Sequence, residues 1–387
     1  MNAIYPRTAP KLRFMAGLYV HVPFCAQACS YCDFHFTTRL QDRDRMVQAL
    51  LLETAEALDQ WRGEQFKTLY FGGGTPSVLG ADNIMRIADV AFRHADWELK
   101  EWTVEANPED LDPATLKALH AGGVTRLSVG IQSFEQDVLE WMRRIHGVER
   151  AESAVQDAMD CGFQHVSLDL MYGLPVGLPG RWERDLAKAC ALPVDHLSCY
   201  ILTAEPRTLY GNQLSTGKLA PPPDGQVLEE YGLLCAVSRS AGFEHYEVSN
   251  LCRPGGRSCH NSAYWNGTHY LGVGPGAHSF RNQTRWWNNR SNAGYLKAAD
   301  DGRFESQRSS ETLSVSDRFN EALITGLRRI EGVDTEELKL ATGLEVHDLS
   351  ELPGLIEAGD CEWIGKQLRI PEHRWPMGDA ITSQLMV

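Results

Sequence analysis

Short runs of β-branched and aromatic residues alternate with helical stretches from Gly17 to about Ile201. Six of these runs have the length and composition of buried strands: LYVHV (18–22), TLYF (68–71), WTVEA (102–106), RLSVGI (126–131), HVSLDLM (165–171) and HLSCYI (196–201). Six successive strand–helix units predict an α/β fold with a parallel sheet, either open or wound into a barrel.

Residues that start and stop helices separate the strands. Asp112 and Pro113 predict the start of one helix and Gly122 its end. A second predicted helix runs from Glu149 to Cys161 and ends at Gly162, where a left-handed conformation is expected.

Polar and catalytically useful residues recur directly after the predicted strands: three cysteines, Gly72–Gly74 with Thr75, Glu105 with Asn107, Gln132 with Ser133, and Asp169. In βα-barrels the active site is built from groups at the carboxyl ends of several strands. The pattern therefore favours a partial barrel of six βα units, a partial (β/α)6 barrel, over an open doubly wound sheet.

The remaining sequence predicts further parts. Residues 202–225 read as a loop, a helix at 226–241 and a strand at 244–249 follow, and the Gly-, Asn-, His- and Trp-rich stretch 253–290 reads as irregular. After this stretch the sequence predicts a small α+β module that resembles a winged helix. Its elements are a helix near 316–330, a second helix after Asp334 and a strand at 363–370. The expected division is a tail (1–16), the barrel (17–225), its extension (226–308) and the C-terminal module (309–387).

The charge of the chain argues against nucleic acid as a partner. The 387 residues carry 37 Lys and Arg against 51 Asp and Glu, a net charge of −14. The C-terminal module, which could bind DNA by its shape alone, has 7 basic and 15 acidic residues between 310 and 387. No apolar run has the length of a signal peptide or a membrane span, so a cytoplasmic protein is expected.

Three of the ten cysteines lie within eight residues, as Cys25, Cys29 and Cys32 in a C-x3-C-x2-C pattern. An ordinary four-thiolate iron–sulfur cluster needs a fourth cysteine, which this spacing lacks. Three thiolates would leave one iron open to a ligand. The alternative is a zinc site completed by His35; the other seven cysteines fit small buried side chains.

The run YVHVPFCAQACSYCD (19–33) resembles the opening of the radical S-adenosylmethionine superfamily, in particular its coproporphyrinogen dehydrogenase branch. The resemblance implies a [4Fe–4S] cluster whose unique iron binds S-adenosylmethionine. A one-electron donor would supply the electron that cleaves this cofactor to methionine and a 5′-deoxyadenosyl radical.

The same resemblance implies a set of cofactor contacts. GGGTPS (72–77) matches the methionine-binding motif of the family, and Glu105 resembles its cofactor-binding carboxylate. Arg144 matches a carboxylate contact, for which its planar guanidinium is suited. The implied contacts of S-adenosylmethionine are Tyr19, Gly73, Gly74, Thr75, Glu105, Gln132, Arg144 and Asp169.

Two departures separate this chain from the dehydrogenases of the branch and bring it closer to its heme chaperones. The dehydrogenases carry a further cysteine two residues after the third ligand, where this chain has Phe34, and they have a longer N-terminal extension. HNSAYW (260–265) matches the HNxxYW motif of the chaperones. His260 is then a candidate axial ligand of heme, with Tyr264 and Trp265 as flat apolar contacts; His21, His146, His269 and His278 are further candidates.

Two functions follow from the resemblance. One is a heme chaperone that binds heme as cargo and delivers it to apo-hemoproteins. The other is a radical enzyme that converts coproporphyrinogen III to protoporphyrinogen IX. Phe34 and the HNxxYW motif favour the chaperone, no membrane span is expected, and a homodimer stays open.

Overall fold

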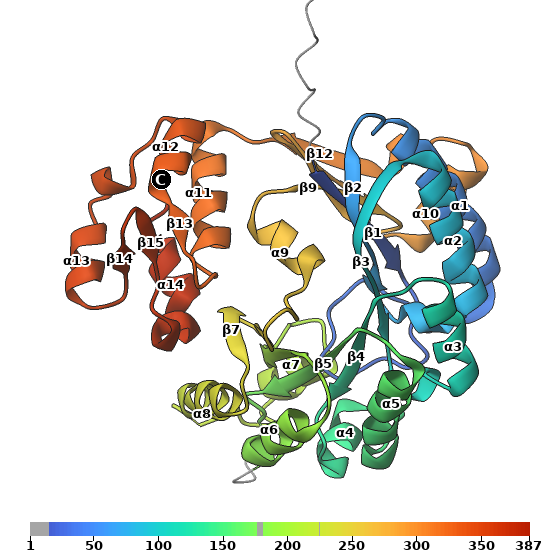
Figure 1. Cartoon of the computed structure of the whole chain (residues 1–387), viewed down its shortest axis with the longest axis horizontal. Helices are drawn as coiled ribbons and strands as arrows, with labels where there is room; N and C mark the ends of the chain where they lie inside the picture. The colour runs from blue at the N-terminus through green and yellow to red at the C-terminus, as the bar shows by residue number, and fades with distance from the viewer. Residues whose placement is uncertain (1–14, 176–180, 224) are drawn as a thin grey trace, which may run out of the picture.

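The computed structural model describes residues 15–175, 181–223 and 225–387 and is built on one large mixed sheet (Figure 1). Its order is β12-β11-β10-β9-β1-β2-β3-β4-β5-β6-β8-β7. The first six strands pair in parallel with one another and are β1 (Met15–Val22), β2 (Gln65–Gly73), β3 (Asp96–Ala106), β4 (Arg126–Gln132), β5 (His165–Tyr172) and β6 (His196–Ile201). The α/β prediction and its six strands are confirmed.

Helices follow these strands and pack on the outer side of the curved sheet (Figure 1). The buried faces of these helices and the outer face of the strands form one core, which includes Leu18, Leu69, Val104 and Leu168. The opposite face carries polar side chains such as Thr103, Ser128 and Asp169, so apolar and polar residues alternate along the strands. The helices are α1 (Arg43–Asp59), α2 (Ala81–His94), α3 (Pro113–Ala121), α4 (Gln136–Met142), α5 (Val148–Cys161) and α6 (Arg181–Ala191).

The helix signals read from the sequence have a direct physical basis. The side chain of Asp112 accepts hydrogen bonds from the backbone N–H groups of Ala114 and Thr115, at 2.8 and 2.9 Å. These bonds satisfy donors that the first turn of α3 leaves free. Gly162, which ends α5, has a φ of 96°, as expected for a left-handed cap.

The stretch 253–290 is ordered, contrary to the irregular segment expected from its composition. It forms the helix α9 (Cys259–Trp265) and the strands β9 (His269–Val273), β10 (His278–Arg281) and β11 (Thr284–Asn288). β9 pairs in parallel with β1, and β10 and β11 continue the sheet in antiparallel fashion to β12 (Arg308–Thr312). The sheet offers every strand a hydrogen-bonding partner, which outweighs weak local propensity.

Smaller differences occur near the other edge of the sheet. The expected loop at 202–225 contains α7 (Leu209–Ser215), and the expected helix is α8 (Gln226–Ser240). The single strand expected at 244–249 is instead a hairpin of β7 (Glu244–Glu247) and β8 (Asn250–Cys252), which pairs with β6.

A buried carboxylate holds the extension of the sheet against α1. Glu53 is fully buried and accepts hydrogen bonds from the backbone of Gly274, the amide of Asn288 and the hydroxyl of Tyr295, at 2.6 to 2.8 Å. Arg308 adds an ion pair at 3.1 Å. The extension and the barrel therefore share a polar anchor as well as a core.

The C-terminal module is a three-stranded sheet surrounded by helices. The strand expected at 363–370 is a tight hairpin, and the sheet order is β13-β15-β14. α9 lies between the barrel strands and this module (Figure 1). The elements are α10 (Asn292–Asp300), before the module, and then α11 (Val315–Gly326), β13 (Val333–Asp334), α12 (Thr335–Thr342), α13 (Leu352–Glu357), β14 (Glu362–Ile364), β15 (Gln367–Arg369), the 3₁₀ helix η6 (Glu372–Met377) and α14 (Gly378–Ser383).

Within the described residues, no helix combines the length and apolar character that crossing a membrane requires.

Candidate functional site

The three cysteines lie in the loop that follows β1, at the carboxyl end of the barrel strands. All three are half-buried free thiols. Two of them receive hydrogen bonds: Thr75 Oγ1 donates to Cys25 Sγ at 3.6 Å, and Arg144 Nη1 donates to Cys29 Sγ at 3.4 Å. Donors of this kind are a means by which a protein stabilises cluster thiolates and tunes their potential.

The spacing of the three sulfur atoms distinguishes between the two metal sites considered from the sequence. In the described part of the chain, no three of Cys25, Cys29, Cys32 and His35 have ligand atoms that all lie within 4.8 Å of one another. A single tetrahedral zinc ion would need its ligands that close. Thiolates spread more widely fit the corners of an iron–sulfur cubane, so the donor set fits the cluster.

His35 has other partners. Its Nε2 lies 2.7 Å from Asn292 Oδ1, and its backbone carbonyl is 2.9 Å from Nε2 of His21. The other ring nitrogen of His21 lies 3.1 Å from the hydroxyl of Tyr19. Tyr19, expected to contact the cofactor, is therefore oriented by a chain of hydrogen bonds that ends at Asn292.

The glycine loop after β2 is packed against the start of the cysteine loop. Gly74 N–H donates to the carbonyl of Val22 at 2.8 Å, and Thr75 N–H donates to that of Phe24 at 2.6 Å. Gly73 has a φ of 110°, and a Cβ added there would lie 2.5 Å from the ring of His21. Glycine is required at this position by both conformation and space.

Arg144 lies at the centre of the strand ends. Its Nη2 donates to Asn107 Oδ1 and to the carbonyl of Gly130, at 2.5 and 2.6 Å. Its Nε is buried and has no hydrogen-bond partner among the described residues. This unpaired N–H donor of Arg144 lies beside the cysteine loop. It fits the cofactor carboxylate that Arg144 is expected to contact.

Gln132 adopts an uncommon conformation at the end of β4. Its φ is 72°, and the register of β4 with β5 shifts between Gly130 and Gln132. Such backbone costs on the order of 1 kcal/mol or more and concentrates at functional sites. The bulge turns the end of β4 at the position where the sequence expects a cofactor contact.

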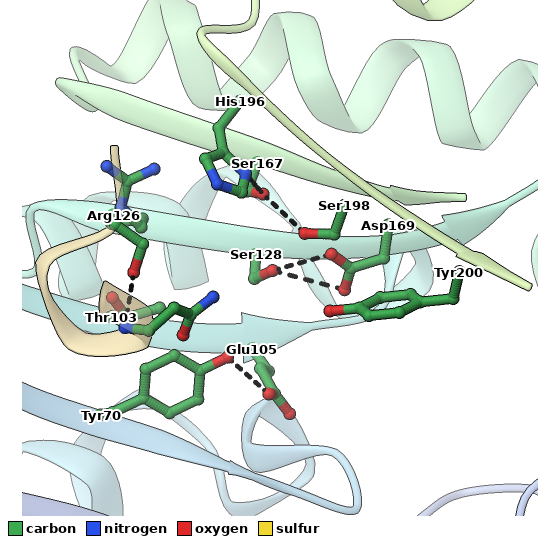
Figure 2. Close-up of a pocket in the computed structure, with 12 residues that line it drawn as sticks. Tyr70, Thr103, Glu105, Arg126, Ser128, Ser167, Asp169, His196, Ser198 and Tyr200 are labelled. Carbon is green, nitrogen blue, oxygen red and sulfur yellow. Dashed lines mark hydrogen bonds between the residues drawn. The ribbon is translucent and has the colours of Figure 1, made fainter. Parts of the chain in front are cut away.

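Two expected carboxylates, Glu105 and Asp169, line a polar cavity inside the barrel (Figure 2). Glu105 accepts hydrogen bonds from Tyr70 at 2.6 Å and from Gly73 N–H at 3.1 Å, and Asp169 accepts one from Ser128 at 3.1 Å. Burial, together with the charge of Asp169, raises the pKa of Glu105 to about 7. Burial raises the pKa of Asp169 to about 6.

The HNxxYW residues form α9, and His260 points into the barrel wall. His260 is 2 % exposed; its Nδ1 lies 2.7 Å from Thr68 Oγ1 and its Nε2 lies 3.3 Å from the hydroxyl of Tyr264. Its ring also stacks on Tyr70 at 4.8 Å. Both ring nitrogens are thus engaged, while Trp265 is half-buried beneath the guanidinium of Arg328.

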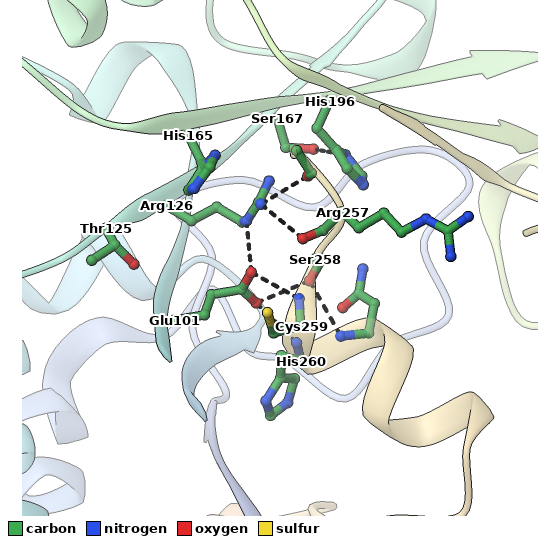
Figure 3. A network of polar contacts seen from close by, with 12 residues as sticks. Glu101, Thr125, Arg126, His165, Ser167, His196, Arg257, Ser258, Cys259 and His260 are labelled. Atoms are coloured by element: carbon green, nitrogen blue, oxygen red, sulfur yellow. Dashed lines mark hydrogen bonds and ion pairs between the residues drawn. The ribbon is translucent and has the colours of Figure 1, made fainter. Parts of the chain in front are cut away.

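The start of α9 is fixed by a buried ion pair that the sequence analysis missed (Figure 3). Glu101 accepts hydrogen bonds from Ser258 Oγ and from the N–H groups of Cys259 and His260, at 2.9 to 3.0 Å. Arg126 pairs with Glu101 at 3.0 Å, and both side chains are 3 % exposed. The carboxylate thus satisfies free donors at the helix N-terminus.

We expect Arg144→Ala to weaken S-adenosylmethionine binding about tenfold to a hundredfold, because it removes a charge-assisted hydrogen bond worth roughly 1.5–3 kcal/mol. Isothermal titration of the protein with its cluster intact measures the effect. Arg143→Ala is a matched control, since the neighbouring Arg143 is exposed. An unchanged dissociation constant in Arg144→Ala would refute the contact.

We also expect the affinity for S-adenosylmethionine to depend on pH. Ionised Glu105 accepts hydrogen bonds from a ligand, and its pKa of about 7 means that it is protonated in acid. Affinity should therefore rise by up to about tenfold per pH unit as Glu105 ionises, and level off above pH 7. Titrations across this range test the prediction. Glu105→Gln should bind more weakly and lose the dependence near pH 7; a wild type with a flat profile would contradict it.

Comparison with known proteins agrees with this geometry. The sequence model of the Radical SAM superfamily matches residues 19–190. The solved structure of coproporphyrinogen III oxidase (HemN) from Escherichia coli, a radical SAM enzyme, superposes with a TM-score of 0.84 at 22% identity, over 97% of this chain and 91% of that one. At this identity the likeness establishes the fold alone.

Closer relatives are found by sequence. The heme chaperone HemW of Bacillus subtilis is 33% identical over 350 residues, which cover 89% of this chain and 92% of the relative. HemW of Mycobacterium tuberculosis is 40% identical over 291 residues, 73% of this chain and 74% of the relative. The chain therefore belongs to the HemN/HemW branch of the radical SAM superfamily.

Proposed function

We propose that the chain is a HemW-like heme chaperone, which binds heme and delivers it to apo-hemoproteins. The observation that carries the proposal is the similarity to the HemW of Bacillus subtilis, which extends over 92% of that relative. The partners would be heme, heme-accepting apo-proteins and a one-electron donor, in the cytoplasm. Nucleic acid is not among them, because the net charge is −14.

In this proposal Cys25, Cys29 and Cys32 hold a [4Fe–4S] cluster, and S-adenosylmethionine binds its open iron. When bound, the pair supplies one-electron reductive chemistry. Arg144 would orient the cofactor carboxylate through its unpaired Nε, and Glu105 would accept hydrogen bonds from the cofactor. The glycines of the 72–74 loop would allow its close approach to the backbone.

The alternative is oxidation of coproporphyrinogen III, the activity named for the structural neighbour. The residue two positions after Cys32 opposes it. The dehydrogenases of the branch are expected to carry a cysteine there, and Phe34 has no thiol. Phe34 is 74% exposed beside the cysteine loop, and it offers apolar area that a porphyrin could cover.

His278 is a better candidate than His260 for the axial ligand of heme. Among the histidines considered from the sequence, His21, His146, His260 and His269 are buried, whereas His278 is exposed. Its ring stacks on Trp287 at 5.7 Å. Partial desolvation of the ring by neighbouring residues, followed by the charge of nearby Arg290, lowers the pKa of His278, so that the neutral imidazole needed for ligation is favoured.

The topology also places His278 near the carboxyl end of β1, next to the cysteine loop. β9 runs parallel to β1, and β10 returns antiparallel to β9. His278, the first residue of β10, is therefore at the edge where β1 ends and the cysteine loop begins. Heme bound there would lie on the same edge of the sheet as the cluster.

We expect stable heme binding by the wild type and no measurable conversion of coproporphyrinogen III under anaerobic conditions. His278→Ala should shift the Soret band or weaken heme binding at least tenfold, because an axial bond to iron is lost. Heme titration by visible spectroscopy and a product assay measure these results. Turnover of coproporphyrinogen by the wild type would favour the enzyme instead.

His260→Ala separates the two ligand candidates. If His260 only positions Tyr70 and Tyr264, its loss should lower stability and leave the Soret position unchanged. A Soret shift in His260→Ala, with none in His278→Ala, would return the ligand to the HNxxYW motif. Circular dichroism and the cluster absorbance control for folding, and Tyr264→Ala and Trp265→Ala should weaken any heme contact without altering ligation.

A further inference from the structure

Three metal-binding side chains from distant segments converge outside the barrel site. Cys235 lies on α8, His245 on β7 and Glu372 at the start of η6, in the C-terminal module. Their ligand atoms all lie within 4.8 Å of one another, and no other group of three His, Cys, Asp or Glu in the described ranges is so close. No step of the proposed function uses them.

The distances between these atoms agree with those around one tetrahedral ion. With bond lengths of about 2.3 Å to sulfur and about 2.0–2.2 Å to nitrogen and oxygen, ligands of zinc are about 3.6 Å (S to N) and about 3.4 Å (N to O) apart. Cys235 Sγ is 3.9 Å from His245 Nδ1, and this nitrogen is 3.1 Å from Glu372 Oε1. Shifts of a few tenths of an ångström would complete the geometry.

The surroundings hold His245 and Glu372 in orientations suited to a metal. His245 Nε2 lies 3.4 Å from the carbonyl of Val248, so that a proton on Nε2 leaves the lone pair of Nδ1 directed at the other two ligands. Arg239 binds the second oxygen of Glu372 at 2.6 Å, which leaves Oε1 for the centre. The side chain of His245 is only 4 % exposed.

The geometry points to a Zn²⁺ site formed by Cys235, His245 and Glu372, with water as the fourth ligand. Mixed sulfur, nitrogen and oxygen donors suit zinc. On binding, the Cys235 thiol loses its proton to solvent, and thiolate and carboxylate together balance the two charges of the ion. The site would join α8 and β7 to η6 and so fasten the C-terminal module to the barrel.

Zinc binding to protein that carries its [4Fe–4S] cluster tests the site. Cys25, Cys29 and Cys32 are then bound to iron and do not take up zinc. Elemental analysis after equilibration with Zn²⁺ and desalting should give about one zinc per chain. Cys235→Ala and Glu372→Gln should each weaken zinc binding at least tenfold. Cys190→Ala is the matched control: Cys190 is another half-buried thiol, which lies outside this group, and its replacement should leave zinc binding unchanged.

Co²⁺ provides a second readout, which identifies the ligand directly. The wild type should develop a thiolate-to-cobalt charge-transfer band and the visible bands of tetrahedral Co²⁺, and Cys235→Ala should lose the former. Iron content and circular dichroism show whether each variant is folded. The proposal is overturned if the cluster-loaded wild type binds no zinc, or if folded Cys235→Ala and Glu372→Gln bind it as tightly as the wild type.

Discussion

Cys29→Ser is expected to reduce the iron of anaerobically reconstituted protein from about four atoms per chain to nearly none, with loss of the brown colour. A three-thiolate cluster has no spare ligand, so one missing sulfur leaves two irons without protein bonds. Iron analysis together with visible absorbance measures the effect; Cys25→Ser and Cys32→Ser should behave alike.

Cys161→Ser serves as the matched control, because Cys161 is a half-buried thiol at the end of α5. It should keep its full iron content. Full iron in the triple variant of Cys25, Cys29 and Cys32 would refute the assignment of the cluster. So would one zinc and no iron at these cysteines in protein prepared without oxygen.

Glu101→Ala is expected to lower the free energy of unfolding by about 3–5 kcal/mol, because Arg126 would keep a buried charge without its partner. The guanidinium is already incompletely satisfied, since its Nη1 has no hydrogen-bond partner in the described structure. The variant also removes the acceptor of the three hydrogen bonds that Ser258, Cys259 and His260 donate at the start of α9. Denaturant unfolding with the cluster intact measures the loss.

The double variant Glu101→Gln/Arg126→Met should unfold with a smaller loss than Glu101→Ala, because it leaves no uncompensated charge. Glu98→Ala is a control on the same strand, where Glu98 forms only surface ion pairs with Lys100 and Lys67. It should have no measurable effect. Equal losses in the double variant and in Glu101→Ala would contradict the role assigned to the uncompensated charge of Arg126.

The parallel strands could be predicted from the sequence because their apolar runs are local and long. The extension could not. Its composition is rich in Gly and Asn, and its strands depend on the pairing of β9 with β1, far away in the chain, because β10 pairs with β9 and β11 with β10. Such pairing is a tertiary effect that local propensity does not record. Similarly, the sequence around Gly365 indicates a strand, although this residue turns the chain between β14 and β15.

The positions of the site residues along the chain were predictable, because strand ends of a parallel sheet meet at one edge. The partners that orient them were not. No sequence motif marks these partners. Their roles are seen only in the structure, where Thr68 contacts His260, Tyr70 contacts Glu105 and Arg126 contacts Glu101. One signal was available for Glu101: a charged residue that directly precedes an apolar strand run has to find a buried partner or point to solvent.

The pairing of β1 with β9 has a consequence for synthesis of the chain. β1 carries the residues before the cysteine loop, yet one of its edges is covered only by residues 269–273, which leave the ribosome after more than half of the chain. Until then the nascent barrel has an open strand edge, the kind of surface that recruits other strands. Translation that stops before β9 would therefore yield an aggregation-prone fragment, and the strand leading to the cysteine loop gains its second neighbour only late in synthesis.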